Sequence, residues 1–309
     1  MVAAYDLAQV EASVATDDQR PWRVSLHGGH SREFSAHASS TLTELLETAV
    51  ERGMVTYGIT DHAPISDVRF LYPDEVAAGL DLDSRFAQFE AYAQASRDAV
   101  DAFAGRIEVL RGFEAEVLPA ASYVADMRRL REQHSFDYAV GSVHWVDETP
   151  IDLSAELFAE LAARLGGIEA LLVRYYASVA EMVERLRPEV VGHFDLPRLY
   201  SADHAAHDAN AVRTAAEDAL RVIAEVGSLV EVNTAGYRKG LGGPYPAPWM
   251  VERASELGIA FTFGDDSHHV DHVAANLERA RAYLLAYGVR NISTLTREAG
   301  AVVRAEVAL

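Results

Sequence analysis

Residues 55–62 read Val-Thr-Tyr-Gly-Ile-Thr-Asp-His, and this stretch sets the pattern that decides the fold. A short run of β-branched and aromatic residues, typical of a strand, ends in an aspartate and a histidine. The amphipathic pattern TLTELLETAVERG precedes it and stops at Gly53, where glycine commonly ends a helix. A helix followed by a strand with polar residues at its carboxyl end is typical of one unit of a parallel α/β fold.

The same unit recurs along the whole chain. Strand-like runs alternate with amphipathic helical segments, which predicts a parallel sheet with helices outside it. The candidate strands are residues 24–27, 55–60, 107–112, 138–143, 190–193, 229–233 and 260–264. No repeat or linker divides the sequence, so we expect one domain over residues 1–309, with residues 1–20 as an N-terminal extension.

Bulk composition limits the class of function. The 309 residues include 47 acidic and 27 basic side chains, a formal charge of -20, which disfavours a polyanion such as nucleic acid as partner. There is no cysteine, so disulfides, thiolate metal sites and cysteine nucleophiles are excluded. No apolar run is long enough to span a membrane, and the acidic start lacks a signal-peptide pattern; we therefore expect a cytoplasmic protein.

Potential metal ligands follow every predicted strand. In a parallel α/β barrel the carboxyl ends of the strands meet on one face, where active sites form, so this placement favours a barrel over an open sheet. Imidazole and carboxylate ligands without thiolates suit Zn, Mn or Fe. The strand-end residues are His27, Asp61, His62, Glu114, Glu116, His144, His193, Asp195, Glu231, Asn233, Asp265, Asp266, His268 and His269, with His30 and His37 in the loop after the first strand.

Some polar residues have a simpler interpretation. His134, His204, His207 and His272 lie in polar helical or loop contexts and are expected to be structural. Asp61, Glu116, Asp195 and Asp265 could cap the following helix or orient a ligand histidine, and Glu231 could be structural or face the substrate. Asp81 precedes a helical pattern and is expected to cap it.

Taken in order, the motifs HGGHS…FSAHA, GITDHAP, GFEAE, GSVHW, VGHFD, EVNTAG and GDDSHH resemble those of the PHP (polymerase and histidinol phosphatase) superfamily. The resemblance runs from about residue 24 to residue 275 and is greatest to histidinol-phosphate phosphatases. It implies a distorted (β/α)7 barrel, similar to a TIM barrel, and a cluster of two to three divalent metal ions.

The resemblance also implies a division of ligands among three metals. His27, His30, Glu114 and Asp266 would surround one metal. Glu114 would bridge to a second that also takes His144 and His193, and the third would be held by His37, His62 and His268. The family's first motif is usually His-x-His, whereas this chain has one residue more. We expect Gly28 and Gly29 to form a bulge or turn that keeps both histidines on one face.

The resemblance further implies hydrolysis of a phosphomonoester, with L-histidinol phosphate, an intermediate of histidine biosynthesis, as substrate. A metal-activated hydroxide would attack the phosphorus, with Asp61, Glu114 and His144 as catalytic residues. Asp61 is one candidate proton donor and a metal-bound water is another. Arg198, Arg238 and Lys239 lie just past strand ends and could bind phosphate oxygens.

Three alternatives stay open at this point. A phosphodiesterase or exonuclease of the same superfamily could use such a site, although the net charge disfavours long polynucleotides. An amidohydrolase-like enzyme is disfavoured because no lysine stands at a strand end to bridge metals. A non-enzymatic metal-binding protein is disfavoured because the set of ligands is complete.

Overall fold

The structure, a computed structural model, describes residues 20–202 and 204–309. Nearly all of the expected N-terminal extension therefore lies outside the described residues. Each of the seven predicted strand positions contains a strand, and neighbouring barrel strands run parallel. They are β1 (Val24–Ser25), β2 (Thr56–Ile59), β3 (Glu108–Arg111), β5 (Val140–Gly141), β8 (Val190–Val191), β9 (Leu229–Asn233) and β10 (Phe261–Gly264).

The strands form two sheets that join into one ring. The first has the order β1-β2-β3 and the second β10-β9-β8-β5-β4, where β4 (Glu114–Ala115) directly continues β3. On one side Leu26 N donates to Phe263 O, which connects β1 to β10. On the other, His62 forms a parallel bridge with Glu114, which connects the end of β2 to β4. This arrangement is the distorted, TIM-barrel-like α/β fold that the sequence predicts.

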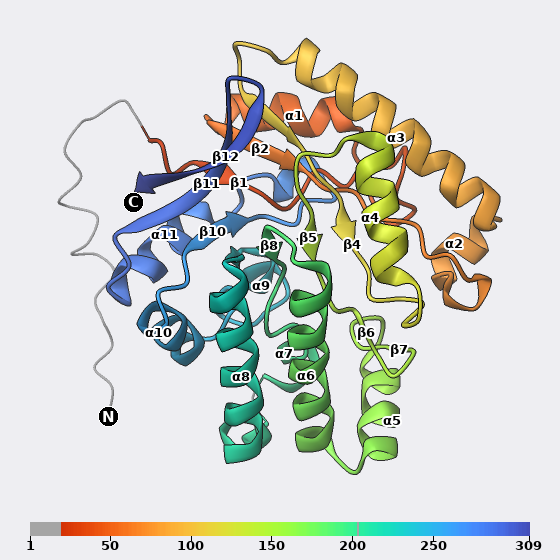
Figure 1. The fold of residues 1–309 in the computed structure, drawn as a ribbon, viewed down its shortest axis with the longest axis vertical. Helices are drawn as coiled ribbons and strands as arrows, with labels where there is room; N and C mark the ends of the chain where they lie inside the picture. Colours follow the sequence, from red (N-terminus) through yellow and green to blue (C-terminus); the bar gives the residue numbers. More distant parts are fainter. Residues whose placement is uncertain (1–19, 203) are drawn as a thin grey trace.

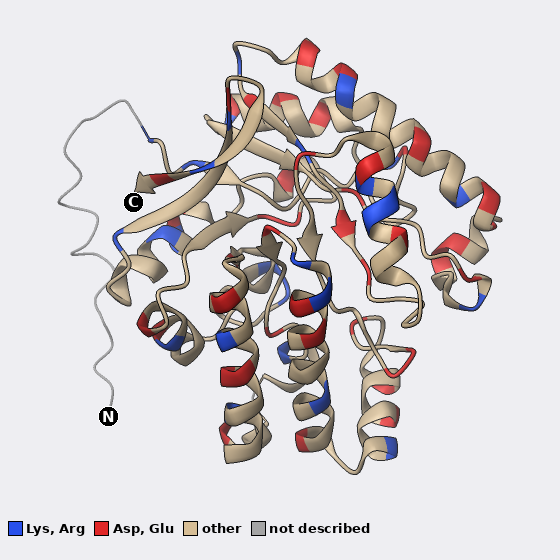
Figure 2. Ribbon diagram, viewed as in Figure 1, with Lys and Arg blue, Asp and Glu red and all other residues tan. Residues whose placement is uncertain are grey.

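Helices surround the strands, as Figure 1 shows. The longer ones are α1 (Leu42–Glu51), α3 (Leu82–Ala102), α4 (Tyr123–His134), α5 (Ala155–Leu165), α6 (Ile168–Leu186), α8 (Asn210–Val226), α10 (Pro248–Glu256) and α11 (Leu277–Ala286). Short helices α2 (Pro73–Ala77), α7 (Arg198–Ser201) and α9 (Ala235–Arg238) lie in the loops. Charged residues recur along α6 and α8 in Figure 2, while their apolar faces contribute to the main core.

A second apolar cluster fills the inside of the ring. It contains Leu26, Leu110, Tyr138, Val140, Val190, Leu229 and Leu295. The Tyr138 side chain crosses the interior and its hydroxyl donates to Leu26 O at 2.7 Å. Gly58 makes this possible, because a Cβ there would lie 1.9 Å from the Tyr138 hydroxyl.

Two hairpins were not expected from the sequence. The C-terminal hairpin pairs β11 (Asn291–Glu298) with β12 (Ala301–Ala308). Its Leu295 enters the interior cluster, and Arg297 N and the Thr296 hydroxyl donate to the carboxylate of Glu108 at the start of β3. The hairpin therefore covers the end of the barrel opposite the predicted site. The smaller hairpin joins β6 (Trp145–Val146) to β7 (Thr149–Pro150), directly after His144.

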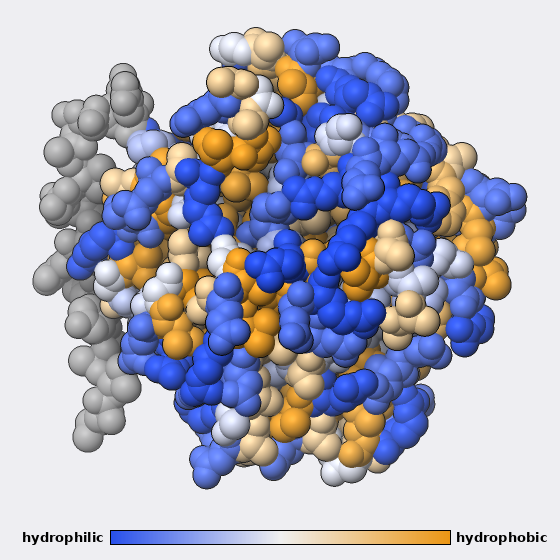
Figure 3. Space-filling model, viewed as in Figure 1, coloured by the Kyte–Doolittle hydropathy of each residue, from blue (hydrophilic) through white to orange (hydrophobic). Residues whose placement is uncertain are grey.

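Asp81 stands directly before α3 on the outside of the barrel. The Asp81 carboxylate accepts a hydrogen bond of 2.8 Å from Ser84 N at the start of α3, which confirms its role as a helix cap. Among the described residues, no helix is both long and apolar enough to cross a membrane. On the face shown in Figure 3, hydrophilic residues predominate and apolar residues form small separate patches.

Candidate metal centre

The carboxylate of Glu114 lies at the centre of the predicted site. Glu114 is in β4 and almost completely buried. One of its oxygens lies 3.3 Å from His27 Nε2 and 3.0 Å from His62 Nδ1, and the other lies 3.2 Å from His193 Nε2 and 3.4 Å from His144 Nε2. Four strand ends thus bring their imidazoles to one carboxylate.

Three groups of side chains place their ligand atoms within 4.8 Å of one another. They are His27, His30 and Glu114; Glu114, His144 and His193; and His30, His62 and His268. The first group holds three of the four residues expected around one metal, without Asp266; the second holds the three expected around another, and Glu114 belongs to both. The third contains His62 and His268 of the expected set together with His30.

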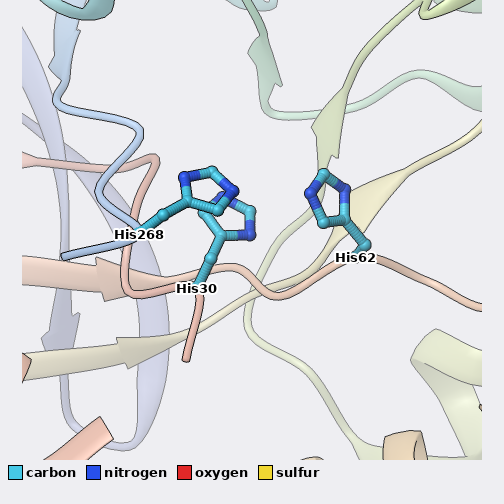
Figure 4. A group of neighbouring side chains, drawn as sticks. All are labelled: His30, His62 and His268. Atoms are coloured by element: carbon cyan, nitrogen blue, oxygen red, sulfur yellow. The ribbon is translucent and has the colours of Figure 1, made fainter. Parts of the chain in front are cut away.

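Figure 4 shows the third group, with the rings of His30 and His268 close together and His62 facing them across a gap. The His30 and His268 rings are stacked, with centroids 4.2 Å apart. His37 remains a neighbour of this group, since its Nε2 lies 3.0 Å from His268 Nε2. Asp266 is also adjacent, with an oxygen 3.8 Å from His30 Nε2 and 3.6 Å from His268 Nδ1.

The two glycines of the first motif form the expected turn. Gly29 has φ +72°, a left-handed conformation that suits glycine. Gly28 also needs to be glycine, because a Cβ there would lie 2.2 Å from the Asp265 carboxylate. The turn brings the rings of His27 and His30 to 5.6 Å, so both side chains face the same centre.

Buried carboxylates hold two of the imidazoles from behind. Glu116 lies 2.8 Å from His144 Nδ1, and Glu231 lies 2.9 Å from His27 Nδ1. Each contact leaves the Nε2 atom of the ring directed at Glu114. Carboxylates in this position fix the orientation of an imidazole and make it a better ligand.

Electrostatics keep the central carboxylate ionised. Burial alone would raise the pKa of Glu114, but the imidazoles of His27, His144 and His62 outweigh it and hold the pKa well below its ordinary value. Burial lowers the pKa of His268 to about 3, so this ring is neutral at physiological pH. An ionised carboxylate and a neutral imidazole are the forms in which these side chains bind metals. For His144, Glu116 and Glu114 outweigh the effect of burial and raise its pKa to about 10, so a metal must displace the proton of this ring.

The donor set fits divalent metal ions. Several buried nitrogen and oxygen atoms of the cluster make no hydrogen bond among the described residues, although such atoms normally have partners. They are His27 Nε2, both ring nitrogens of His30 and of His62, Glu116 Oε2 and His193 Nδ1. Unpaired imidazole nitrogens that converge on a buried carboxylate are what a site for Zn, Mn or Fe requires.

The other predicted residues lie around this cluster. Asp61 accepts hydrogen bonds from His62 N and Ser31 N, and burial raises its pKa to about 6. Asp195 accepts from Ala247 N, and Asp265 accepts from Tyr57 and Ala274 N, so both have structural contacts.

The three predicted phosphate-binding cations differ in their surroundings. Arg238 donates to Asp265 O and Asp266 O at 2.7 Å each, which makes it a support of that loop. One terminal nitrogen of Arg198 contacts Asp195 and Pro244 O. Lys239 is exposed.

The remaining histidines have local contacts outside the cluster. His134, the last residue of α4, packs against Phe89 and Phe136. His207 contacts the Ser201 hydroxyl. His204 and His269 accept hydrogen bonds at the starts of short 3-10 helices. His272 Nδ1 faces His268 N at 3.4 Å.

Residues that the sequence did not single out line a pocket beside His62 and Glu116. They include Ile65, Leu71, Tyr72, Glu75 and Arg85, all between β2 and the first turns of α3. Glu75 and Arg85 form a buried ion pair of 2.6 Å. The sequence offers one signal for this pocket, which is the long segment after the strand end at His62. Loops at this face of a barrel commonly carry functional residues.

Comparison with known proteins identifies the family of this chain. The PHP domain family matches residues 27–235, so the chain belongs to the PHP family. Its curated relatives include a probable histidinol-phosphatase of Schizosaccharomyces pombe, 30% identical over 278 residues, covering 89% of this chain and 90% of the relative. The histidinol-phosphatase of Saccharomyces cerevisiae is 27% identical over 292 residues, covering 84% of this chain and 87% of that protein.

Solved structures support the fold. A candidate histidinol phosphatase from Listeria monocytogenes superposes with a TM-score of 0.72 at 24% identity, covering 82% of this chain and 98% of that one. Histidinol phosphate phosphatase from Lactococcus lactis, crystallised with zinc, L-histidinol and phosphate, gives a TM-score of 0.65 at 17% identity, covering 91% and 99%.

Proposed function

We propose that this protein hydrolyses L-histidinol phosphate to L-histidinol and inorganic phosphate, a step of histidine biosynthesis, with two to three divalent metal ions. The observation that carries the proposal is the convergence of unpaired imidazole nitrogens on the Glu114 carboxylate. The chain is a phosphatase of the PHP family, and curated relatives of similar length are named histidinol-phosphatases.

The metal-holding residues are proposed to be His27, His30, His62, Glu114, His144, His193, Asp266 and His268, with His37 at the edge of the third group. Divalent metals supply Lewis acidity and positive charge to a transferring phosphoryl group. The protein's part is to hold these side chains rigidly in a site shielded from bulk water. Glu116 and Glu231 do so by fixing the rings of His144 and His27.

Asp61 is proposed to donate a proton to the leaving group. Burial raises the pKa of its carboxyl group to about 6, so a fraction is protonated near neutral pH. The leaving alkoxide of histidinol needs a proton, and Asp61 stands next to His62 and 4.0 Å from His30 Nδ1. Glu114 and His144 take part by holding the reacting centre.

Cations beside the cluster are proposed to bind phosphate oxygens. Arg198 has part of its guanidinium free of the contacts to Asp195 and Pro244. The charge of Lys239 acts on Asp266, which places it near the cluster. We assign Arg238 the task of holding the carbonyls of Asp265 and Asp266, so that it acts on the site through this loop.

The test is release of inorganic phosphate from L-histidinol phosphate by protein of known metal content. Other phosphomonoesters and the diester bis-p-nitrophenyl phosphate are assayed beside it. Preferential turnover of L-histidinol phosphate with two to three bound metals is the expected result. Preferential cleavage of the diester would replace the proposal with a phosphodiesterase. Turnover only of other monoesters would keep the phosphatase and discard the substrate.

A further inference from the structure

Asp152 lies beside the candidate metal centre on a loop that was not part of the sequence prediction. It follows the β6–β7 hairpin, and Ile151 N donates a 2.9 Å hydrogen bond back to His144 O. The Tyr200 hydroxyl of α7 donates to Asp152 O at 3.0 Å. Because α7 begins at Arg198, Asp152 is held between the strand end that carries His144 and the helix that carries a proposed phosphate-binding cation.

The carboxylate of Asp152 has no partner for one of its oxygens. Oδ1 is buried and makes no hydrogen bond. Among residues 20–202 and 204–309, no arginine, lysine or histidine nitrogen forms an ion pair with Asp152. By contrast, Asp147 in the turn of the β6–β7 hairpin pairs with Arg174 at 2.9 Å. A buried carboxylate oxygen without a partner is unfavourable, and a ligand that donates a hydrogen bond relieves that cost.

The charge of Asp152 acts on Tyr72, a side chain of the pocket beside His62. Burial raises the pKa of Tyr72, and the charges of Glu116 and Asp152 raise it further. Tyr72 and Glu116 both line the pocket beside His62. Glu116 also has a buried oxygen without a hydrogen-bond partner, so each of the two carboxylates has an acceptor without a donor.

We propose that Asp152 is a specificity-determining residue that pairs with the ammonium group of the substrate. This inference rests on the proposed function and adds that the enzyme selects cationic phosphomonoesters over neutral ones. In an amino-alcohol phosphate the amine and the ester oxygen are on neighbouring carbons. A group that binds the amine must therefore lie beside the phosphate site, and Asp152 lies between His144 and α7. An ammonium offers three N–H donors, and one oxygen of the Asp152 carboxylate has no donor.

The experiment compares matched substrates on the wild type, D152N and the control D147N. Asparagine keeps the shape of the side chain and removes its charge. The substrates are L-histidinol phosphate and p-nitrophenyl phosphate, with O-phosphoethanolamine and ethyl phosphate as a smaller cationic and neutral pair. In D152N we expect the ratio of kcat/KM for cationic over neutral substrate to fall about tenfold or more, as loss of a charge-assisted hydrogen bond predicts. We expect D147N to keep the wild-type ratio, because Asp147 is paired on the surface.

Two further readouts separate specificity from damage to the site. Inhibition by L-histidinol should weaken in D152N, while inhibition by inorganic phosphate and the bound metal content stay at wild-type values. An unchanged ratio in both substrate pairs would overturn the inference, as would an equal loss on cationic and neutral esters together with loss of metal. If the wild type ignores L-histidinol phosphate, the proposed function fails; the O-phosphoethanolamine and ethyl phosphate pair then still tests Asp152.

Discussion

Glu231 and His27 form a fully buried pair, with 2.9 Å between a carboxylate oxygen and the ring Nδ1. The same carboxylate also accepts from His193 N at 2.6 Å and from Asn233 Nδ2 at 2.7 Å. It therefore connects three strand ends beneath the candidate metal centre. Gly264 leaves the space for it, since a Cβ there would lie 2.1 Å from the Glu231 carboxylate.

The first prediction concerns the stability contributed by this pair. In metal-free protein, E231A should lower the free energy of unfolding by about 3 kcal/mol or more, because it strips buried groups of their partner. E231Q should cost less, since its amide oxygen can still accept from His193 N. Urea unfolding of chelator-treated protein measures both. The control is E306A, on an exposed β12 residue that contacts Asn291; equal midpoints for E231A and E306A would refute the prediction.

A second prediction concerns the central ligands. His144→Ala should reduce phosphatase turnover to background and lower the bound metal content, because His144 contributes to the group that contains Glu114 and His193. His204→Ala serves as the matched control, since this exposed histidine caps a 3-10 helix away from the cluster. Metal analysis and phosphate release are measured on the same preparations. Wild-type activity in His144→Ala would rule out the proposed metal centre.

Removal of metal should also destabilise the folded protein. A ligand that binds only the native state adds about 2.7 kcal/mol at a hundredfold excess over its Kd. The unpaired nitrogens of His30 and His62 predict such binding. We expect Tm to fall on chelation by several degrees and to recover when Zn, Mn or Fe is restored. A Tm that does not respond to chelator or to any of these metals would contradict the prediction.

Much of the fold could be predicted from the sequence because barrel strands are short, buried and followed by glycine or polar residues. The seven strand positions follow from that local pattern. The C-terminal hairpin was missed, although residues 291–308 alternate and turn at Gly300. Its role in covering the barrel depends on Leu295 and Arg297 meeting residues far away in sequence, which no local pattern reveals.

The candidate site, like the fold, has one part that the sequence predicts and another part that it does not. Strand-end positions predict that Glu114, His144 and His193 meet, because parallel strands present their carboxyl ends on one face. The loop residues are harder to place. The turn at Gly29 brings His30 to the third group beside His62 and His268, and His37 lies next to His268. Asp152 could not be identified, because its position depends on how the β6–β7 hairpin folds back onto His144.

The last prediction tests the packing inside the barrel. Gly58→Ala should lower the free energy of unfolding by about 1–3 kcal/mol, since overpacking a filled interior forces its neighbours to move. The new methyl group would lie 1.9 Å from the Tyr138 hydroxyl and 3.1 Å from Leu26 Cα. The G58A/Y138F double variant should lose less unfolding free energy than the sum of the losses measured for G58A alone and Y138F alone. The reason is that phenylalanine removes the oxygen that clashes with the new methyl group. Gly243→Ala is the control, as nothing lies within 4 Å of a Cβ there. Urea unfolding of the four variants and the wild type measures the coupling, and strictly additive costs would show that Gly58 and Tyr138 do not share this space.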